Sequence, residues 1–401
     1  MQANRILRQY AEESAVLWGL RSRVARKPDA SFKRLVDFDW RLEAHLDGLR
    51  TAGKAGCEIA LEVLGEGGRG ALFAAAATAL ALSGEKGLIE LLPQCKGEKA
   101  FVEMASALAW VSPAWFIENA AKWVMAEDTG GIALIACSLM RHDPGESLDF
   151  AANSGDPFRS ARAFRTAGEL GRRDMIGSIE SALRSENSDV RGWAAWSGAR
   201  FRSPAAQAAL LELVFDMPFG EIAAPMAGRA CDAPAIRASI ARPGLSPDSL
   251  RRAIMLAGHL GDPVTVPLLL DQMQDDIQAR QAAEAFSNIT GVDLVREHLV
   301  RPPPETPDDA DLTADDPDTD LAWPDHWKAS VWWENHTSSY ESGVRYVAGV
   351  PARSNAVGGL LNNRRQGFRA IAAVELSVQR PGQPILNVRA PAFRQQASQL
   401  V

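Results

Sequence analysis

Apolar side chains recur every three or four residues along most of this chain, which is the spacing that places them on one face of an α-helix. The clearest stripes lie between residues 156 and 291, where polar residues fill the intervening positions. They include Leu250, Ala253, Ala257 and Leu260, then Ala279, Ala282, Phe286 and Ile289. Each predicted helix therefore has an apolar face that a neighbouring helix must cover.

An aspartate followed by an arginine two to four residues later recurs with a period near thirty. Successive arginines of these pairs stand 32, 60 and 29 residues apart, a period typical of stacked helix pairs. Acid–base chemistry can use a carboxylate beside a guanidinium, but recurrence once per repeat favours helix N-caps and hydrogen bonds between repeats. We interpret the set as a structural ladder that comprises Asp156, Arg159, Asp189, Arg191, Arg251 and Arg280.

The pattern predicts an all-α fold: an α-solenoid of stacked helix pairs with a mixed, mostly helical C-terminal cap. The 401 residues exceed the usual size of one compact core, which favours a structure that grows in one dimension. We predict an N-terminal helical cap at 1–55 and a repeat array at 56–300. An acidic, proline-rich linker at 301–325 and an Arg- and Trp-rich segment at 326–401 follow.

The predicted linker differs sharply from its surroundings. It holds nine acidic residues, and five prolines lie between Pro302 and Pro317. Such a stretch has too little apolar surface to fold alone, so we expect an exposed, extended linker. A basic partner or a metal ion is the alternative, but the carboxylates lack the spacing of a calcium loop.

The last segment combines tryptophans with arginines. Four of the eleven tryptophans lie between Trp323 and Trp333, and residues 343–401 hold eight arginines, one glutamate and no lysine. Arginine without lysine favours planar, bidentate contacts with carboxylates. The segment is expected to face either the acidic linker or the helix C-termini of the array, or else an acidic partner or a nucleic acid. Candidate partner-binding residues are Trp332, Trp333, Arg364, Arg365 and Arg369.

The composition of the chain argues against some classes of function. The formal charge of −7 argues against a protein whose main task is to bind nucleic acid. The four cysteines are widely spaced, the first residues do not resemble a secretion signal, and no apolar run is long enough to span a bilayer. We therefore predict a cytoplasmic protein with no membrane contact.

No catalytic signature is present. The sequence lacks the HExxH, GxxxxGK[ST] and GxSxG motifs, and its histidines are scattered singly. We therefore assign no catalytic residue, no cofactor and no metal ligand.

Two levels of resemblance can be named. The unit Asp156-Pro-Phe-Arg159, with Gly168 and Gly171, and its echo at 258–262 resemble the HEAT-like repeats first described in phycobilisome lyases. Over nearly its full length, the chain resembles an uncharacterised bacterial family of HEAT-like repeat proteins. The matching segments are 40–53, 279–293, 343–351, 364–376 and 388–395. Members of that family are often encoded near type VI secretion effector genes, which implies a cytoplasmic role in effector loading.

Two functional hypotheses result. The first is a non-enzymatic scaffold or adaptor that binds a protein partner, such as a secreted effector or its adaptor. The second is an enzyme that acts on a nucleobase or a tetrapyrrole in the concave groove of the repeats, because enzymes on helical-repeat scaffolds exist. The absence of a catalytic motif favours the scaffold.

Overall fold

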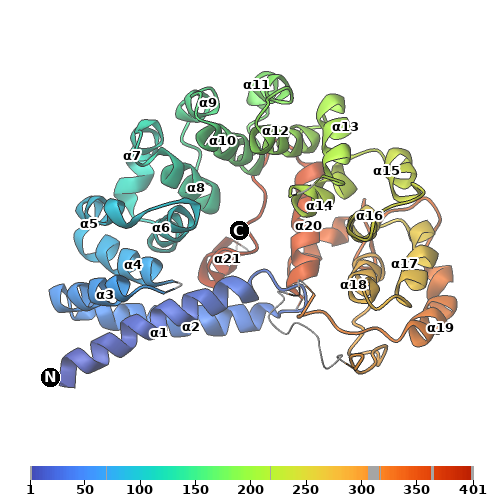
Figure 1. The fold of residues 1–401 in the computed structure, drawn as a ribbon, viewed down its shortest axis with the longest axis horizontal. Helices are drawn as coiled ribbons and strands as arrows, with labels where there is room; N and C mark the ends of the chain where they lie inside the picture. Colours follow the sequence, from blue (N-terminus) through green and yellow to red (C-terminus); the bar gives the residue numbers. More distant parts are fainter. Residues whose placement is uncertain are drawn as a thin grey trace. The chain divides into compact units, whose positions relative to one another are not determined.

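The computed structural model describes residues 2–68, 70–216, 218–305, 316, 318–362 and 365–398. The all-α prediction is confirmed: in these ranges the regular structure is helical apart from one two-stranded hairpin and isolated bridge residues, among them the pair Val300 and Pro324 (Figure 1). The chain forms two compact units. Unit 1 comprises the described residues within 1–26, 30–197 and 382–401, and unit 2 those within 27–29 and 198–381.

Unit 1 contains the helices of the first half of the chain and one from its last residues. Its helices are α1 (Gln2–Val24), α2 (Phe32–Thr51), α3 (Lys54–Glu66), α4 (Ala71–Ser83), α5 (Glu85–Leu91), α6 (Glu98–Val111), α7 (Ala114–Met125), α8 (Gly130–Met140), α9 (Ser147–Ala152), α10 (Pro157–Leu170), α11 (Ile176–Ala182), most of α12 (Ser188–Arg200), and α21 (Ala392–Ser398). The 3-10 turns η1 (Leu92–Gln94) and η2 (Arg173–Met175) lie between them.

Unit 2 contains the second half of the repeats and most of the C-terminal segment. Its helices are α13 (Pro204–Leu213), α14 (Gly220–Ala230), α15 (Ala233–Ile240), α16 (Pro247–Leu260), α17 (Val266–Gln272), α18 (Ala279–Thr290), α19 (His326–His336) and α20 (Gln366–Gln379). The turns η3 (Pro263–Thr265), η4 (Thr337–Ser339) and η5 (Asn355–Asn362) accompany them. Strands β1 (Tyr346–Val347) and β2 (Val350–Pro351) pair antiparallel, with Val347 opposite Val350.

Within each unit, every second helix of the repeats stacks on the next. In unit 1 the stack runs α4, α6, α8, α10, and in unit 2 it runs α14, α16, α18. The intervening helices α7, α9, α13, α15 and α17 each pack on a member of the stack. Repeated helix pairs are thus present in both units, as the period near thirty predicts, whereas the solenoid as a whole stays a prediction.

Small residues set the distance between stacked helices. A Cβ atom on Gly168 of α10 would lie 2.1 Å from the Ser197 Oγ atom of α12, inside unit 1. In unit 2, a Cβ atom on Gly258 of α16 would lie 2.6 Å from the Ala285 Cα atom of α18. Glycine at these positions therefore permits an approach that any other residue would block.

At the C-terminal end of the predicted linker, some of the described residues are packed rather than exposed. Arg301 and Trp323 share a backbone hydrogen bond of 3.0 Å, and Asp318 is buried with 3% of its surface exposed. Residues 306–315 and 317 of this segment lie outside the described residues. The segment from 326 is mixed and mostly helical, as predicted, and the described part of it is divided between the two units at residue 381.

Candidate functional site

Helix α19 exposes an apolar face. Asp325 begins the helix by accepting a hydrogen bond from the Lys328 backbone N–H at 3.2 Å. Trp327 and Val331 lie one helical turn apart and are 70% and 39% exposed. Because large aromatic side chains are usually buried, an indole exposed to this extent beside a second apolar residue is a candidate contact for a partner.

The opposite side of α19 packs onto the repeats of unit 2. Trp332 and Trp333 contact the buried ring of Phe286 edge-to-face, with ring centroids 5.7 and 6.3 Å apart. Trp333 also meets Tyr340 at 5.2 Å. The two predicted partner-binding tryptophans are thus both half-buried packing residues, and Trp332 also lines a pocket.

A shallow pocket of about 300 Å³ lies beside Trp332. The indole of Trp332 stacks on the His336 imidazole with centroids 4.0 Å apart, and the His336 Nδ1 atom lies 2.6 Å from the Trp332 carbonyl oxygen. The pocket is lined by Thr290, Gly291, Val292, Asp293, Arg296, Glu297, Trp332 and His336. An aromatic wall with charged residues of both signs suits the side chains of a protein partner.

Of the predicted arginines, Arg365 and Arg369 do not contribute to this surface. Arg365 forms an ion pair with the buried carboxylate of Glu284 at 2.8 Å. Arg369 is buried in α20 and donates to the Leu361 carbonyl oxygen at 2.7 Å and to Gln366 Oε1 at 2.8 Å. Burial lowers the pKa of Arg369 to about 10. Arg364 lies outside the described residues.

In unit 2, the arginine-rich segment binds the C-terminal ends of the stacked helices. The Arg345 guanidinium donates to the carbonyl oxygen of Leu260 at 2.9 Å, and the Tyr346 N–H donates to that of Gly261 at 2.7 Å. The Ala348 N–H donates to the carbonyl oxygen of Asn288 at 2.8 Å. These groups satisfy the carbonyls that end helices α16 and α18.

The last residues of the described chain do the same in unit 1. Arg394 donates to the carbonyl oxygen of Trp110, at the end of α6, at 2.6 Å. The Asn387 side chain donates to that of Leu139 in α8 at 2.9 Å, and the Ile385 N–H to that of Glu169 in α10 at 2.8 Å. The sequence leaves open whether the arginine-rich segment faces the acidic linker, the helix C-termini or a partner. The contacts described here are with helix C-termini.

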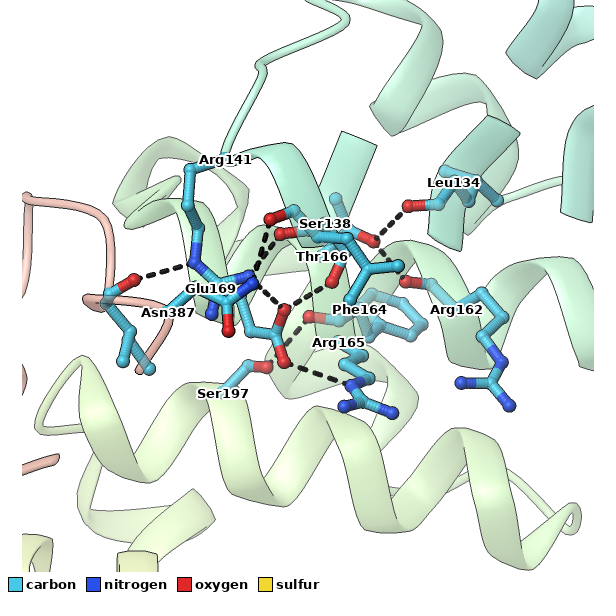
Figure 2. A network of polar contacts seen from close by, with 12 residues as sticks. Leu134, Ser138, Arg141, Arg162, Phe164, Arg165, Thr166, Glu169, Ser197 and Asn387 are labelled. Atoms are coloured by element: carbon cyan, nitrogen blue, oxygen red, sulfur yellow. Dashed lines mark hydrogen bonds and ion pairs between the residues drawn. The ribbon is translucent and has the colours of Figure 1, made fainter. Parts of the chain in front are cut away.

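A buried ionic network links α8, α10 and this segment in unit 1 (Figure 2). Arg141 binds the Glu169 carboxylate at 2.6 Å, and Arg165 binds its other oxygen at 3.1 Å. The Ser138 hydroxyl donates to the same carboxylate, and Arg141 also donates to the Ile385 carbonyl oxygen at 2.6 Å. Burial raises the pKa of Glu169, but the two guanidiniums and the hydroxyl outweigh burial and lower the pKa to about 2.

A second cluster of perturbed groups lies in unit 2. Burial, together with nearby Arg345, lowers the pKa of Arg229 to about 9. Burial, followed by the charge of Arg229, lowers the pKa of His259 to about 3. The Arg229 guanidinium lies 3.6 Å from the Glu375 carboxylate and donates to the Tyr346 carbonyl oxygen at 3.0 Å. Its position between α14, α20 and β1 makes this cluster part of the packing of unit 2.

The structural ladder forms as predicted at its first rung. Asp156 caps α10 by accepting from the Phe158 N–H at 3.0 Å. Arg159 donates to the Val124 carbonyl oxygen at the end of α7 at 2.7 Å, which links neighbouring repeats of unit 1. Asp189 lies inside the first turn of α12, and Asn187 accepts the hydrogen bonds of the N-cap instead.

The later arginines of the ladder bind other partners. Arg191 donates to the nearby Ser185 carbonyl oxygen at 2.6 Å. Arg251 and Arg280 form ion pairs with aspartates of the acidic segment. The contact that corresponds to Arg159 and Val124 is made in unit 2 by Arg252, which donates to the Phe215 carbonyl oxygen at 3.1 Å. Because Arg251 and Arg252 are adjacent, the period alone did not distinguish them.

Trp327, Arg296 and His336 are the surface residues that sequence reasoning missed. The signal for Trp327 was its position one turn before Val331, on the face of α19 opposite the packing residues. Across the described ranges, no three His, Cys, Asp or Glu side chains come close enough together to hold a metal ion. None of the helices there combines the length and apolar character needed to span a bilayer.

Comparison with known proteins gives no family assignment. No protein-family model matches the chain, and no curated protein matches it.

Proposed function

We propose that this chain is a non-enzymatic, helical-repeat scaffold that binds a protein partner on the exposed face of α19 and in the adjoining pocket. The observation that carries the proposal is the exposed pair Trp327 and Val331 next to the Trp332–His336 stack. Tryptophan anchors contribute much of the binding energy of protein interfaces, especially beside pockets. The packing of Trp332 and Trp333 onto Phe286 supports a rigid presentation of that face.

The resemblance to the bacterial HEAT-like family suggests the kind of partner. On that basis the partner is a type VI secretion effector or its adaptor, and the encounter takes place in the cytoplasm. The alternative enzyme that acts on a nucleobase or a tetrapyrrole would require a substrate-sized groove with groups for acid–base chemistry. The exposed aromatic face on α19 favours the scaffold.

The test is affinity purification of the tagged full-length chain from its host cell, with Trp327→Ala and Trp40→Ala variants in parallel. Trp40 is a matched control because it is 72% exposed on a helix of unit 1. A partner captured by the wild-type chain and by Trp40→Ala, but lost with Trp327→Ala, supports the proposal. The purified pair is then expected to lose about 2 kcal/mol of binding free energy on Trp327→Ala, about thirty-fold in Kd.

Two results would contradict this assignment. Equal capture by the wild-type chain and by Trp327→Ala would show that the face of α19 is not the docking surface. Loss with Trp40→Ala alone would move the site to unit 1 while leaving the scaffold function intact.

A further inference from the structure

Three cations of unit 2 bind one short acidic segment, which consists of Asp316 and residues 318–323. Arg251 of α16 binds Asp318 through two parallel hydrogen bonds of 2.6 and 2.8 Å. Arg280 of α18 binds Asp316 at 2.7 Å, and Lys27 binds Asp320. Because these aspartates lie within five residues of each other, the three cations must lie within about 15 Å along one path. We call Lys27, Arg251 and Arg280 the basic strip.

The contact between Asp318 and Arg251 is buried and bidentate, which distinguishes it from an ordinary surface ion pair. Asp318 is 3% exposed, and its carboxylate meets the planar guanidinium of Arg251 in the bidentate arrangement that is strongest for this pair. The Arg280 and Arg301 guanidiniums both lie over the Trp323 indole, 4.5 and 5.2 Å from its centroid. Both ionic and cation–π contacts thus hold this segment.

The acidic segment depends on the basic strip for its order. Its sequence, in which three aspartates precede Leu321 and Trp323, has too little apolar surface to fold by itself. Within the described residues, Lys27 and Arg280 have no other carboxylate partner, and the remaining acidic neighbour of Arg251 is Glu221 at 3.6 Å. Removal of the segment, which includes Trp323, would therefore expose the cations of the basic strip.

We propose that the basic strip is a recognition site for an acidic peptide segment of a protein partner, and that the chain's own Asp316 and residues 318–323 occupy it in the unbound state. The peptide class follows from the occupant, in which aspartates at alternate positions are followed by a tryptophan. This inference rests on the proposed scaffold function and adds the chemistry of a second partner contact. A partner peptide must compete with a tethered segment whose effective concentration is about millimolar.

The experiment uses the full chain with Asp316→Asn, Asp318→Asn and Asp320→Asn combined, and a fluorescent peptide of sequence DPDTDLAW. Fluorescence anisotropy should show at least ten-fold tighter binding to this variant than to the wild-type chain. Binding should weaken as salt is raised, because the attraction is ionic. The matched peptide NPNTNLAW should not bind, and adding Arg251→Ala and Arg280→Ala to the triple variant should abolish binding of DPDTDLAW.

Circular dichroism of the triple variant shows whether it remains helical. If it does not, Asp316→Asn alone is used, because the Asp316 side chain is 45% exposed and its loss disturbs packing little. The proposal is overturned if the folded variant binds the peptide no better than the wild-type chain, or binds both peptides equally. Binding of duplex DNA without binding of the peptide would also overturn it, in favour of a phosphate site. In each of these cases the capture test with Trp327→Ala still decides the scaffold function separately.

Discussion

The Glu169 network in unit 1 gives the most quantitative prediction. Glu169→Gln keeps the size of the side chain but removes the negative charge that neutralises Arg141 and Arg165. The Arg141 guanidinium would remain partly buried between α8 and the 385–387 segment, held by carbonyl oxygens but without a counterion in this network. We expect the variant to fold with a marked loss of stability in unit 1.

Two estimates of the loss agree. Lowering the pKa of Glu169 from 4.5 to about 2 corresponds to about 3 kcal/mol of folding free energy. Breaking a buried ion pair by removing one partner typically costs about 3–5 kcal/mol. We therefore expect Glu169→Gln to lose about 3 kcal/mol at pH 7.

The loss should depend on pH in a defined direction. The folded state binds the Glu169 proton less tightly than the unfolded state, so its charge stabilises the fold fully above pH 4.5. That stabilisation decreases as pH falls from 4.5 towards 2, where the folded carboxylate is itself protonated. The difference between wild type and variant should thus be constant from pH 7 to about pH 5.5 and shrink at lower pH.

Urea titrations followed by circular dichroism measure the difference, and hydrogen exchange of α8 and α10 amides assigns it to unit 1. Glu118→Gln, on the exposed surface of α7, is the control and should change stability by less than about 0.5 kcal/mol. A Glu169→Gln variant as stable as this control, or a difference that grows as pH falls, would refute the ionic account.

Three further predictions concern unit 2. Phe286→Ala should cost about 3–5 kcal/mol in denaturant titrations, because the ring is fully buried; no loss would mean that it does not support α19. Gly261→Ala should abolish or strongly reduce soluble folded protein, since φ is +74° and a Cβ atom would lie 2.1 Å from the Tyr346 carbonyl oxygen; near-normal stability would contradict that approach. Burial and the charge of Arg229 lower the pKa of His259 to about 3. The stability of the fold should therefore decrease as pH falls below 6.5, because the unfolded state then binds a proton that the folded state does not. In thermal melts between pH 7 and 4.5, His259→Gln should make stability depend less steeply on pH.

The sequence predicted the helices well because their signal is local. Phe286 and its apolar neighbours at helical spacing are buried in α18, as their periodicity requires. N-caps were harder, because several acceptors compete within one turn. Asp156 caps α10 as predicted, but Ser246 caps α16 two residues before Asp248. Periodicity locates such a helix end to within a turn and does not select the acceptor.

The sequence did not predict which residues far apart in the chain form ion pairs. Arg251 pairs with Asp318, 67 residues later, and Arg365 with Glu284, 81 residues earlier. Either arginine could satisfy its charge with many carboxylates of this chain, and only the packed fold brings one of them within reach. The same holds for the exposed site, since Trp327 and Trp332 look alike in sequence and differ only in the face of α19 that they occupy.

The discontinuity of unit 1 has a consequence for biosynthesis. All of its helices except α21 are translated first, but the groups that bind the ends of α6, α8 and α10 lie at residues 385–394 and leave the ribosome only after all of unit 2. Until then those carbonyls face water or a chaperone. The nascent chain must therefore hold its first half in an incomplete state for the time needed to translate nearly two hundred residues, at about 5–20 residues per second.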